Sequence, residues 1–112
     1  MRPIYRGDDK TYTLEFLKDD GGSIDITDWK IYFTMKQHLN MSDAKAGVKV
    51  DVTDHDAPEN GKTSIYLSKE DTTNLLLCVY FFDIQVKKAG GDILTVMAGR
   101  IKVLGDVTRR WD

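Results

Sequence analysis

The sequence predicts an all-β fold, a two-layer antiparallel β-sandwich of seven or eight strands, and three observations support this prediction. Large apolar residues alternate with polar ones along most of the chain. Turns rich in Asp and Gly separate the alternating segments at regular intervals. One segment, residues 68–77, breaks the alternation and predicts one short helix. The chain has 112 residues, so we expect a single domain spanning 1–112.

The clearest strand lies in the stretch "DITDWKIYFTMK", residues 25–36. From residue 29 onward, every second residue is large and apolar, which places these residues on one face of a strand. The residues between them form a polar face without any acid, His, Cys or Ser, so this face offers no catalytic chemistry. The apolar positions are Trp29, Ile31, Phe33 and Met35, and the polar positions are Lys30, Tyr32, Thr34 and Lys36.

Three further strands are predicted before this one. Residues 2–6 fit a short edge strand, because Pro3 suits a sheet edge or a strand start. Residues 10–18 and 23–27 both alternate, and the sequence "DDGG" at 19–22 is typical of the turn between two strands.

The middle of the chain alternates less continuously. Residues 38–46 show no period and predict a loop, whereas 47–53 and 62–68 predict strands joined by a long turn at 54–61.

The predicted helix over 68–77 begins with a capping signal and is followed by a hairpin. Ser68 precedes Asp71 by three residues, which resembles a capping box with Asp in place of Glu, and we expect about two turns of helix. Long strands are predicted over 78–88 and 92–107, joined by the turn "AGG".

Three details of this hairpin carry specific expectations. The apolar phase changes at Gly99, which predicts a β-bulge there. Tyr80 follows a crossover near the start of a long strand, as in a tyrosine corner. Phe81 alternates with Tyr80 and Phe82, so both faces carry rings, and we expect another chain or the helix to cover the outer one.

Composition excludes several classes of partner. Sixteen Lys and Arg against 18 Asp and Glu give a net charge of −2, with both signs mixed, so neither nucleic acid nor an anionic membrane is expected as a partner. No apolar run is long enough to span a membrane, and "MRPIYRGDDK" lacks the apolar core of a secretory signal. We therefore expect synthesis in a cytoplasm. The single cysteine, Cys78, excludes an internal disulfide and is expected to be a buried thiol.

The residues with catalytic or metal-binding chemistry do not form a recognisable motif. The acidic loop at 51–60 has oxygen ligands suited to calcium, but the EF-hand spacing fails at Ala57-Pro58. His38 and His55 lie in predicted loops without zinc spacing, and no serine has a nucleophile motif. We expect no catalytic residue, no metal and no cofactor, and hence no enzyme. A small hydrolase or metal enzyme built on residues 51–60 is the alternative.

The chain also resembles a known family in the order of its parts. The stretches that carry the resemblance are "YRGDDKTYTLEFLKDDGGSIDITDWKIYFTMKQ", "LSKEDTTNLLLCVYFFDIQVKKAGGDILTVMAGRIKV" and the ending "GDVTRRW". Together they resemble the immunoglobulin-like N-terminal module of phage baseplate upper proteins and related prophage tail proteins. The resemblance covers nearly the whole chain and rests on strand and turn residues. The chain departs from the family pattern before the "YFFDI" strand, where apolar "LLLCV" stands in place of small residues.

The resemblance implies an immunoglobulin-like sandwich that acts as a structural part of a tail. We therefore expect a non-enzymatic structural or assembly module, made in the bacterial host cytoplasm and present in the virion tail, which docks with other tail or baseplate subunits. A homo-oligomer is also possible. The alternative is a carbohydrate- or surface-binding sandwich that uses exposed aromatic residues. The candidate interface residues are Lys30, Tyr32, Phe81, Arg109, Arg110 and Trp111.

Overall fold

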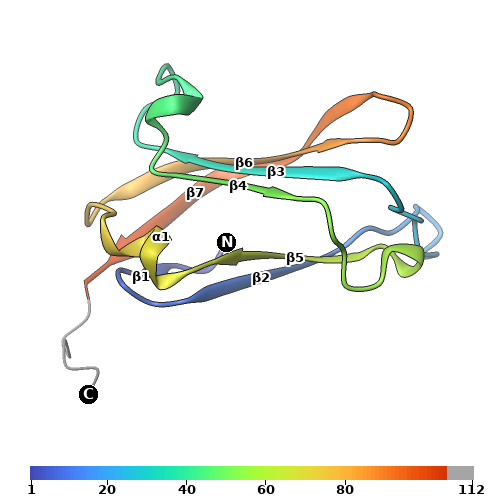
Figure 1. Ribbon diagram of the computed structural model, residues 1–112, viewed down its shortest axis with the longest axis horizontal. Coiled ribbons are helices and arrows are strands. Elements are labelled where there is room, and N and C mark those ends of the chain that lie inside the picture. The colour runs from blue at the N-terminus through green and yellow to red at the C-terminus, as the bar shows by residue number, and fades with distance from the viewer. Residues whose placement is uncertain (106–112) are drawn as a thin grey trace.

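The fold is organised by the pairing of two strongly alternating segments, residues 30–36 and 79–87. The computed structural model describes residues 1–105, and Figure 1 shows their arrangement. In this range the strands are β1 (Ile4–Tyr5), β2 (Lys10–Glu15), β3 (Lys30–Lys36), β4 (Val48–Val52), β5 (Lys62–Leu67), β6 (Val79–Lys87) and β7 (Ile93–Leu104). The helical elements are α1 (Lys69–Thr73) and two 3₁₀ turns, η1 (Asp43–Lys45) and η2 (Pro58–Asn60).

These strands form two layers of unequal width. One sheet has five strands in the order β1-β7-β6-β3-β4, and the other contains only β2 and β5. Figure 1 shows the two-stranded sheet lying against the five-stranded sheet, which curls over it. All pairs are antiparallel except β1 with β7, which is parallel.

The expected antiparallel immunoglobulin-like sandwich is therefore only partly right. The protein is mostly β with one short helix, but its larger sheet is mixed and curled like a half-barrel, and it is not clearly an immunoglobulin sandwich. One cause is that residues 23–27 do not form the strand predicted for them, so the second layer lacks a third member.

The 23–27 segment is a loop held by side-chain and isolated backbone bonds. The N–H of Ile26 donates to the carbonyl of Pro58, and the carboxylate of Asp25 accepts from the N–H of Thr27. Asp28 then adopts a left-handed conformation with φ 65°. Buried Ile26 thus fills the core without a sheet partner, which explains why alternation alone gave the wrong element.

The core confirms the alternation of the two central strands. In β3, Ile31, Phe33 and Met35 are completely buried, as the sequence predicts. The buried residues of β6 face the same side, because directly opposed residues of paired strands share a face. Across the core these residues meet the second layer, whose buried residues are Tyr12, Thr63, Ile65 and Leu67.

The helix α1 has the predicted cap but is shorter than expected. The Ser68 hydroxyl accepts from the N–H of Asp71, whose carboxylate accepts from the N–H of Ser68. The helix ends at Thr73, before the leucines of residues 75–77.

The turn between β1 and β2 is fastened to this helix. The Thr72 hydroxyl accepts from the N–H of Gly7 and donates to the carbonyl of Asp8. The carboxylate of Asp9 accepts from the Tyr66 hydroxyl and from the N–H of Lys69. These bonds connect the start of the chain to the crossover between the layers.

Tyr80 confirms the expected tyrosine-corner contact. Its ring is buried, and its hydroxyl accepts from the N–H of Leu76, four residues upstream. Gly47 lies so close to this ring that an added Cβ would come 2.8 Å from Tyr80 Cε2.

The bulge in the β6–β7 hairpin lies three residues before its predicted position. Ile84 pairs with Met97 and the next residue, Gln85, pairs with Thr95, so Val96 is the extra residue. Gly99 instead pairs regularly with Phe82, whose ring lies 3.2 Å from where a Cβ would be. Bulky side chains at this position would collide with that ring, so the glycine serves packing.

We predict that Gly47→Ala destabilises the fold by about 1–3 kcal/mol, because the new methyl group collides with Tyr80 and Leu75. The matched control is Gly90→Ala, where nothing lies within 4 Å of the added Cβ. Urea denaturation of the two variants measures the difference, and equal midpoints would contradict the packing role of Gly47.

We also predict that Asp9 stabilises the fold in a pH-dependent way. Hydrogen bonds from the Tyr66 hydroxyl and the Lys69 N–H lower the pKa of Asp9 below its ordinary 3.8. A lowered folded-state pKa gives stability that is present above pH 3.8 and is lost as the pH falls through the folded-state pKa. Asp9→Asn should therefore have a lower free energy of unfolding than wild type at neutral pH, and this gap in stability should narrow in acid. Urea midpoints across this pH range, with Asp8→Asn as the control, check this. A gap independent of pH would contradict it.

Candidate protein interface

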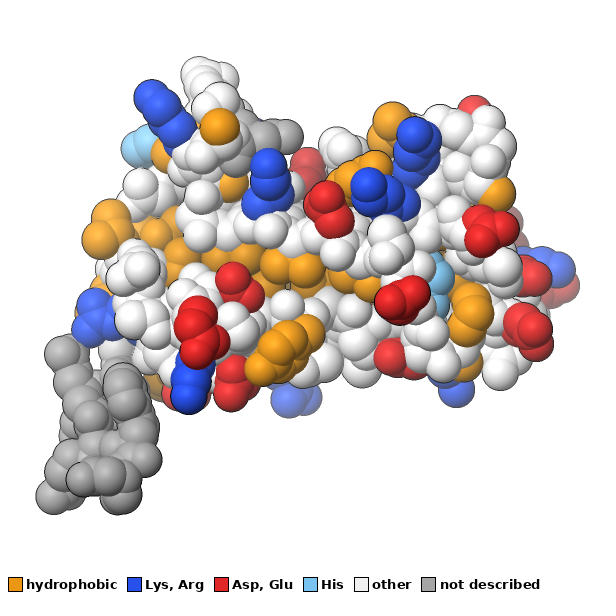
Figure 2. Space-filling view, in the orientation of Figure 1, with side chains coloured by type: hydrophobic (Ala, Val, Ile, Leu, Met, Phe, Trp, Pro, Cys, Tyr) orange, Lys and Arg blue, Asp and Glu red, His pale blue; other side chains and the backbone are white. Residues whose placement is uncertain are grey.

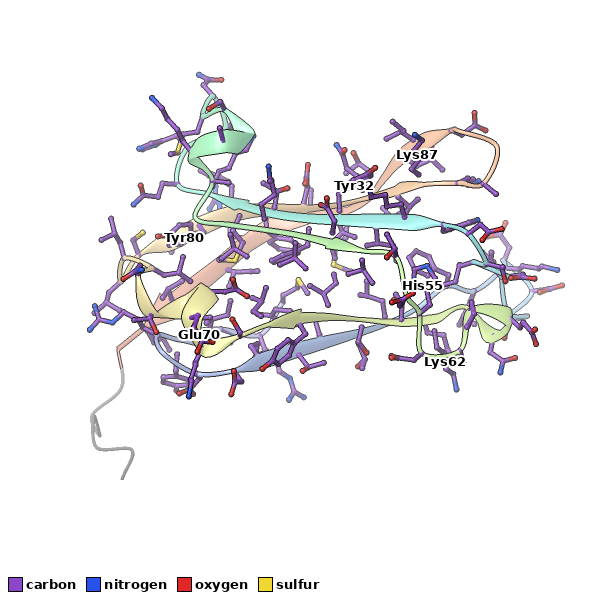
Figure 3. The ribbon with its side chains drawn as sticks, viewed as in Figure 1. Tyr32, His55, Lys62, Glu70, Tyr80 and Lys87 are labelled. Atoms are coloured by element: carbon purple, nitrogen blue, oxygen red, sulfur yellow. The ribbon has the colours of Figure 1, made fainter. Side chains whose placement is uncertain are left out.

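The outer face of the five-stranded sheet carries the predicted contact residues that the structure describes. Lys30, Tyr32 and Phe81 all point away from the second layer, because their strand neighbours are buried in the core. Figure 3 shows Tyr32 on this outer side, opposite the second layer. The other predicted residues, Arg109, Arg110 and Trp111, lie outside the described residues.

Two of the aromatic rings on this face, Phe81 and Tyr32, each lie beneath a cation. The Arg100 guanidinium lies 5.5 Å from the centre of the Phe81 ring, and Lys30 Nζ lies 5.3 Å from that of Tyr32. These distances are within cation–π range. The sequence predicts that another chain or the helix covers the outer ring; in the structure, Arg100 of the neighbouring strand β7 covers part of Phe81, and cover by another chain stays a prediction.

A hollow of about 280 Å³ opens beside Phe81. Its walls come from the outer faces of β3, β6 and β7, and from Leu39 in the loop that follows β3. Leu39 is 73% exposed, the most of any large hydrophobic side chain among residues 1–105. The hollow is therefore lined by Phe81 from the sheet and by the exposed side chain of Leu39 from the loop. Its lining residues are Thr34, Lys36, Leu39, Phe81, Phe82, Asp83, Gln85 and Ala98.

A second exposed surface, which sequence analysis missed, runs along the first part of β7. Ile93, Leu94, Val96 and Met97 are 60%, 46%, 44% and 42% exposed. Among residues 1–105, β1 pairs with β7 only at Val103 and Leu104, so the segment 93–100 is bonded to β6 on one side and no described strand pairs with its other side. We call residues 93–100 the β7 edge.

The β7 edge is apolar on both faces. Leu94 and Met97 oppose the buried residues Val86 and Ile84 of β6, so they lie on the core face of the sheet. They are nevertheless exposed, because the two-stranded layer does not cover them.

On the opposite flank of the protein, β4 of the five-stranded sheet meets β5 of the two-stranded sheet. Figure 2 shows the side on which β4 and β5 lie, with a band of hydrophobic side chains visible between the two layers. β4 and β5 contact one another but belong to different sheets.

In the acidic loop at 51–60, the side chains of His55 and Asp56 form hydrogen bonds to neighbouring segments of the fold. His55 points between the layers, where its Nε2–H donates to the Trp29 carbonyl (2.7 Å) and its Nδ1 accepts from the Thr63 hydroxyl (2.8 Å) (Figure 3). The carbonyl can only accept, which assigns the proton to Nε2 in neutral His55. The Asp56 carboxylate accepts from Ser64. Within residues 1–105, no three His, Cys, Asp or Glu side chains gather as a metal site would require.

Cys78 is half-buried and packs against the core, and its Sγ lies 3.9 Å from Gln37 Nε2. Among the described helices, none has the length and apolar character needed to cross a membrane.

Comparison with known proteins finds similarity in structure only. No family model matches the sequence, and no curated protein matches it. The fold is similar to the solved N-terminal domain of phage TP901-1 ORF48, with a TM-score of 0.53 at 13% identity. The match covers 95% of this chain and 84% of that one. At this identity, the likeness establishes a shared fold.

We predict that His55→Leu lowers the free energy of unfolding by about 2 kcal/mol, because it leaves the hydroxyl of Thr63 and the carbonyl of Trp29 without their partner. Thr63 is 1% exposed, so water does not replace the lost bond easily. His38→Leu, in an exposed loop, is the control and should change stability by less than about 0.5 kcal/mol. Equal effects in chemical denaturation would show that the His55 bonds do not stabilise the fold.

Proposed function

We propose that this chain is a non-enzymatic structural or assembly module of a phage or prophage tail, and that it acts by docking to other tail proteins. The observation that carries the proposal is the fold match to the N-terminal domain of phage TP901-1 ORF48, which extends over nearly the whole chain.

The outer face of the five-stranded sheet is the docking surface that we favour. It combines one ring in a shallow hollow with cations and polar side chains around it, and aromatic anchors with a polar surround are typical of protein interfaces. Phe81 is the proposed anchor, with Lys30 and Tyr32 as contacts further along the sheet. Arg109, Arg110 and Trp111 remain predicted contacts from the sequence.

The internal contacts of the acidic loop favour docking over catalysis. His55 and Asp56 would be the first candidates for a general base or metal ligand, yet both are engaged in bonds that hold the 54–61 loop to Trp29, just before β3, and to β5. The proposed activity requires no chemistry from these groups.

A carbohydrate-binding module receives less support. Such a module stacks sugars on neighbouring exposed rings, whereas the most exposed tyrosines of residues 1–105, Tyr5 and Tyr66, lie on strands of different sheets. The Tyr66 hydroxyl is also bonded to Asp9.

The test is complementation of a phage or prophage from which the gene for this chain has been deleted. We expect loss of infectious particles on deletion, rescue by the wild-type gene, and recovery of the protein in purified tails. Phe81→Ser should remove the protein from particles, because it removes the anchor. The matched control, Lys18→Ser in the exposed turn after β2 of the other layer, should leave incorporation unchanged.

Normal, infectious particles without the protein would contradict a structural role. Unchanged incorporation of Phe81→Ser, with folding verified by circular dichroism, would contradict the assignment of the outer face.

A further inference from the structure

We propose that the β7 edge binds a second copy of this chain by antiparallel strand pairing, which joins the two five-stranded sheets across a two-fold axis. This inference rests on the geometry of β7 and goes beyond the proposed tail function, since it names a partner and a register.

The hairpin bonds show which backbone groups face the open side. The N–H of Lys88 donates to the carbonyl of Asp92, so these residues form a hydrogen-bonded pair at the turn. Bonded and non-bonded pairs alternate along an antiparallel ladder, so the N–H and C=O groups of Ile93 and Thr95 point away from β6.

The other end of β7 gives an independent reference. The N–H of Val103 donates to the carbonyl of Cys78, and the carbonyl of Leu104 accepts from Arg6 on the β1 side. Counting back from Val103 in the same alternation, Arg100 and Ala98 also direct their backbone groups to the open side. The extra residue Val96 shifts the alternation by one position, so the outward-facing positions are odd-numbered before it and even-numbered after it.

The four outward positions are therefore 93, 95, 98 and 100, and this set is symmetric about a point between Val96 and Met97. A second copy related by a two-fold axis through that point places Ile93 opposite Arg100 and Thr95 opposite Ala98. Every outward group of one copy then meets an outward group of the other, which is the requirement for an isologous contact. The two bulges face one another at the axis.

The side chains are complementary in this register. On the core face, Leu94 comes opposite Gly99, so a large side chain meets a position without one. Arg100 comes opposite Ile93 on the outer face, so its apolar stem packs against the isoleucine at both ends of the contact. The segment 93–99 contains no charge and no proline, the usual protection of a sheet edge against pairing.

The structure also sets where the pairing ends. β1 occupies the same side of β7 from Val103 onward, and Met1 and Pro3, which lead into β1, share a hollow with Arg100 and Lys102. Among the described residues, the part of β7 that is open to a second strand therefore ends at Arg100. Exposed apolar side chains on both faces of this segment would be covered in part by the paired strand and its β6 neighbour.

The first experiment is light scattering after size exclusion, over a concentration series, for the full chain and two variants at one position. Wild type should show a monomer–dimer equilibrium. Thr95→Pro should remove the dimer, since it deletes an outward N–H that β6 does not use. Thr95→Val keeps that N–H and should retain the dimer. Circular dichroism confirms folding of each variant.

The second experiment tests the register by disulfide formation in a Cys78→Ala background. Thr95 and Ala98 of opposite copies should be within disulfide reach, so the double variant T95C/A98C should form a covalent dimer on oxidation. T95C alone should form far less, because residue 95 does not oppose itself. This test does not depend on a proline variant.

A wild-type chain that remains monomeric at every concentration would overturn the proposal and leave the edge for a strand of a different protein. A dimer that persists in Thr95→Pro, or that crosslinks equally in T95C alone, would also overturn it and direct attention to the outer face.

Discussion

The fold depends on one imbalance: a five-stranded sheet with an apolar inner face is covered by only two strands. Alternation along β3 and β6 sends large side chains to a single face, and burial of that face is the main favourable term for folding. β2 and β5 cover its centre, where Phe33 packs against Tyr12 and Phe82 at ring-centre distances of 6.2 and 6.1 Å.

The remaining area is covered by loops and short turns, each held by specific polar bonds. The loop around Ile26 is attached to η2, His55 connects Trp29 to β5, and α1 is tied to the turn after β1. In the part of the chain that the structure describes, no such element reaches the first part of β7, which leaves Leu94 and Met97 exposed on the core face. The exposed edge thus follows from the same imbalance that shapes the sandwich.

Sequence alone predicted the parts of the fold that depend on local pattern. The strands β3 and β6 follow from period-two alternation, and the start of α1 follows from the hydrogen-bonding chemistry of Ser68 and Asp71. The outward direction of Lys30, Tyr32 and Phe81 follows from the same alternation. Whether these residues contact a partner stays a prediction.

The parts that depend on long-range pairing could not be predicted. Ile24 and Ile26 alternate like a strand, yet Ile26 is held in a loop by the carbonyl of Pro58, which lies far along the chain. The parallel pairing of β1 involves too few residues to leave a sequence signal. The exposed β7 edge looks like any buried strand in sequence, because only the reach of β1 and the width of the second layer decide its exposure. One signal was present: the absence of charge over residues 93–99.

The two exposed surfaces are compatible with simultaneous use. The hollow at Phe81 lies on the outer face of the sheet, whereas the β7 edge presents backbone groups sideways. A pair of chains joined at β7 would keep both outer faces available, so a dimeric module with two docking surfaces is consistent with the proposed role in a tail.

The central claim, that the β7 edge is open in the monomer and closes on a second copy, is tested most directly by amide hydrogen exchange measured by NMR at low and high protein concentration. The account predicts that the amides of Thr95, Ala98 and Arg100 exchange quickly in dilute solution and become protected at high concentration, whereas those of Leu94 and Gly99 are protected in both. Slow exchange of all five amides in dilute solution, or rates that do not change with concentration, would contradict it.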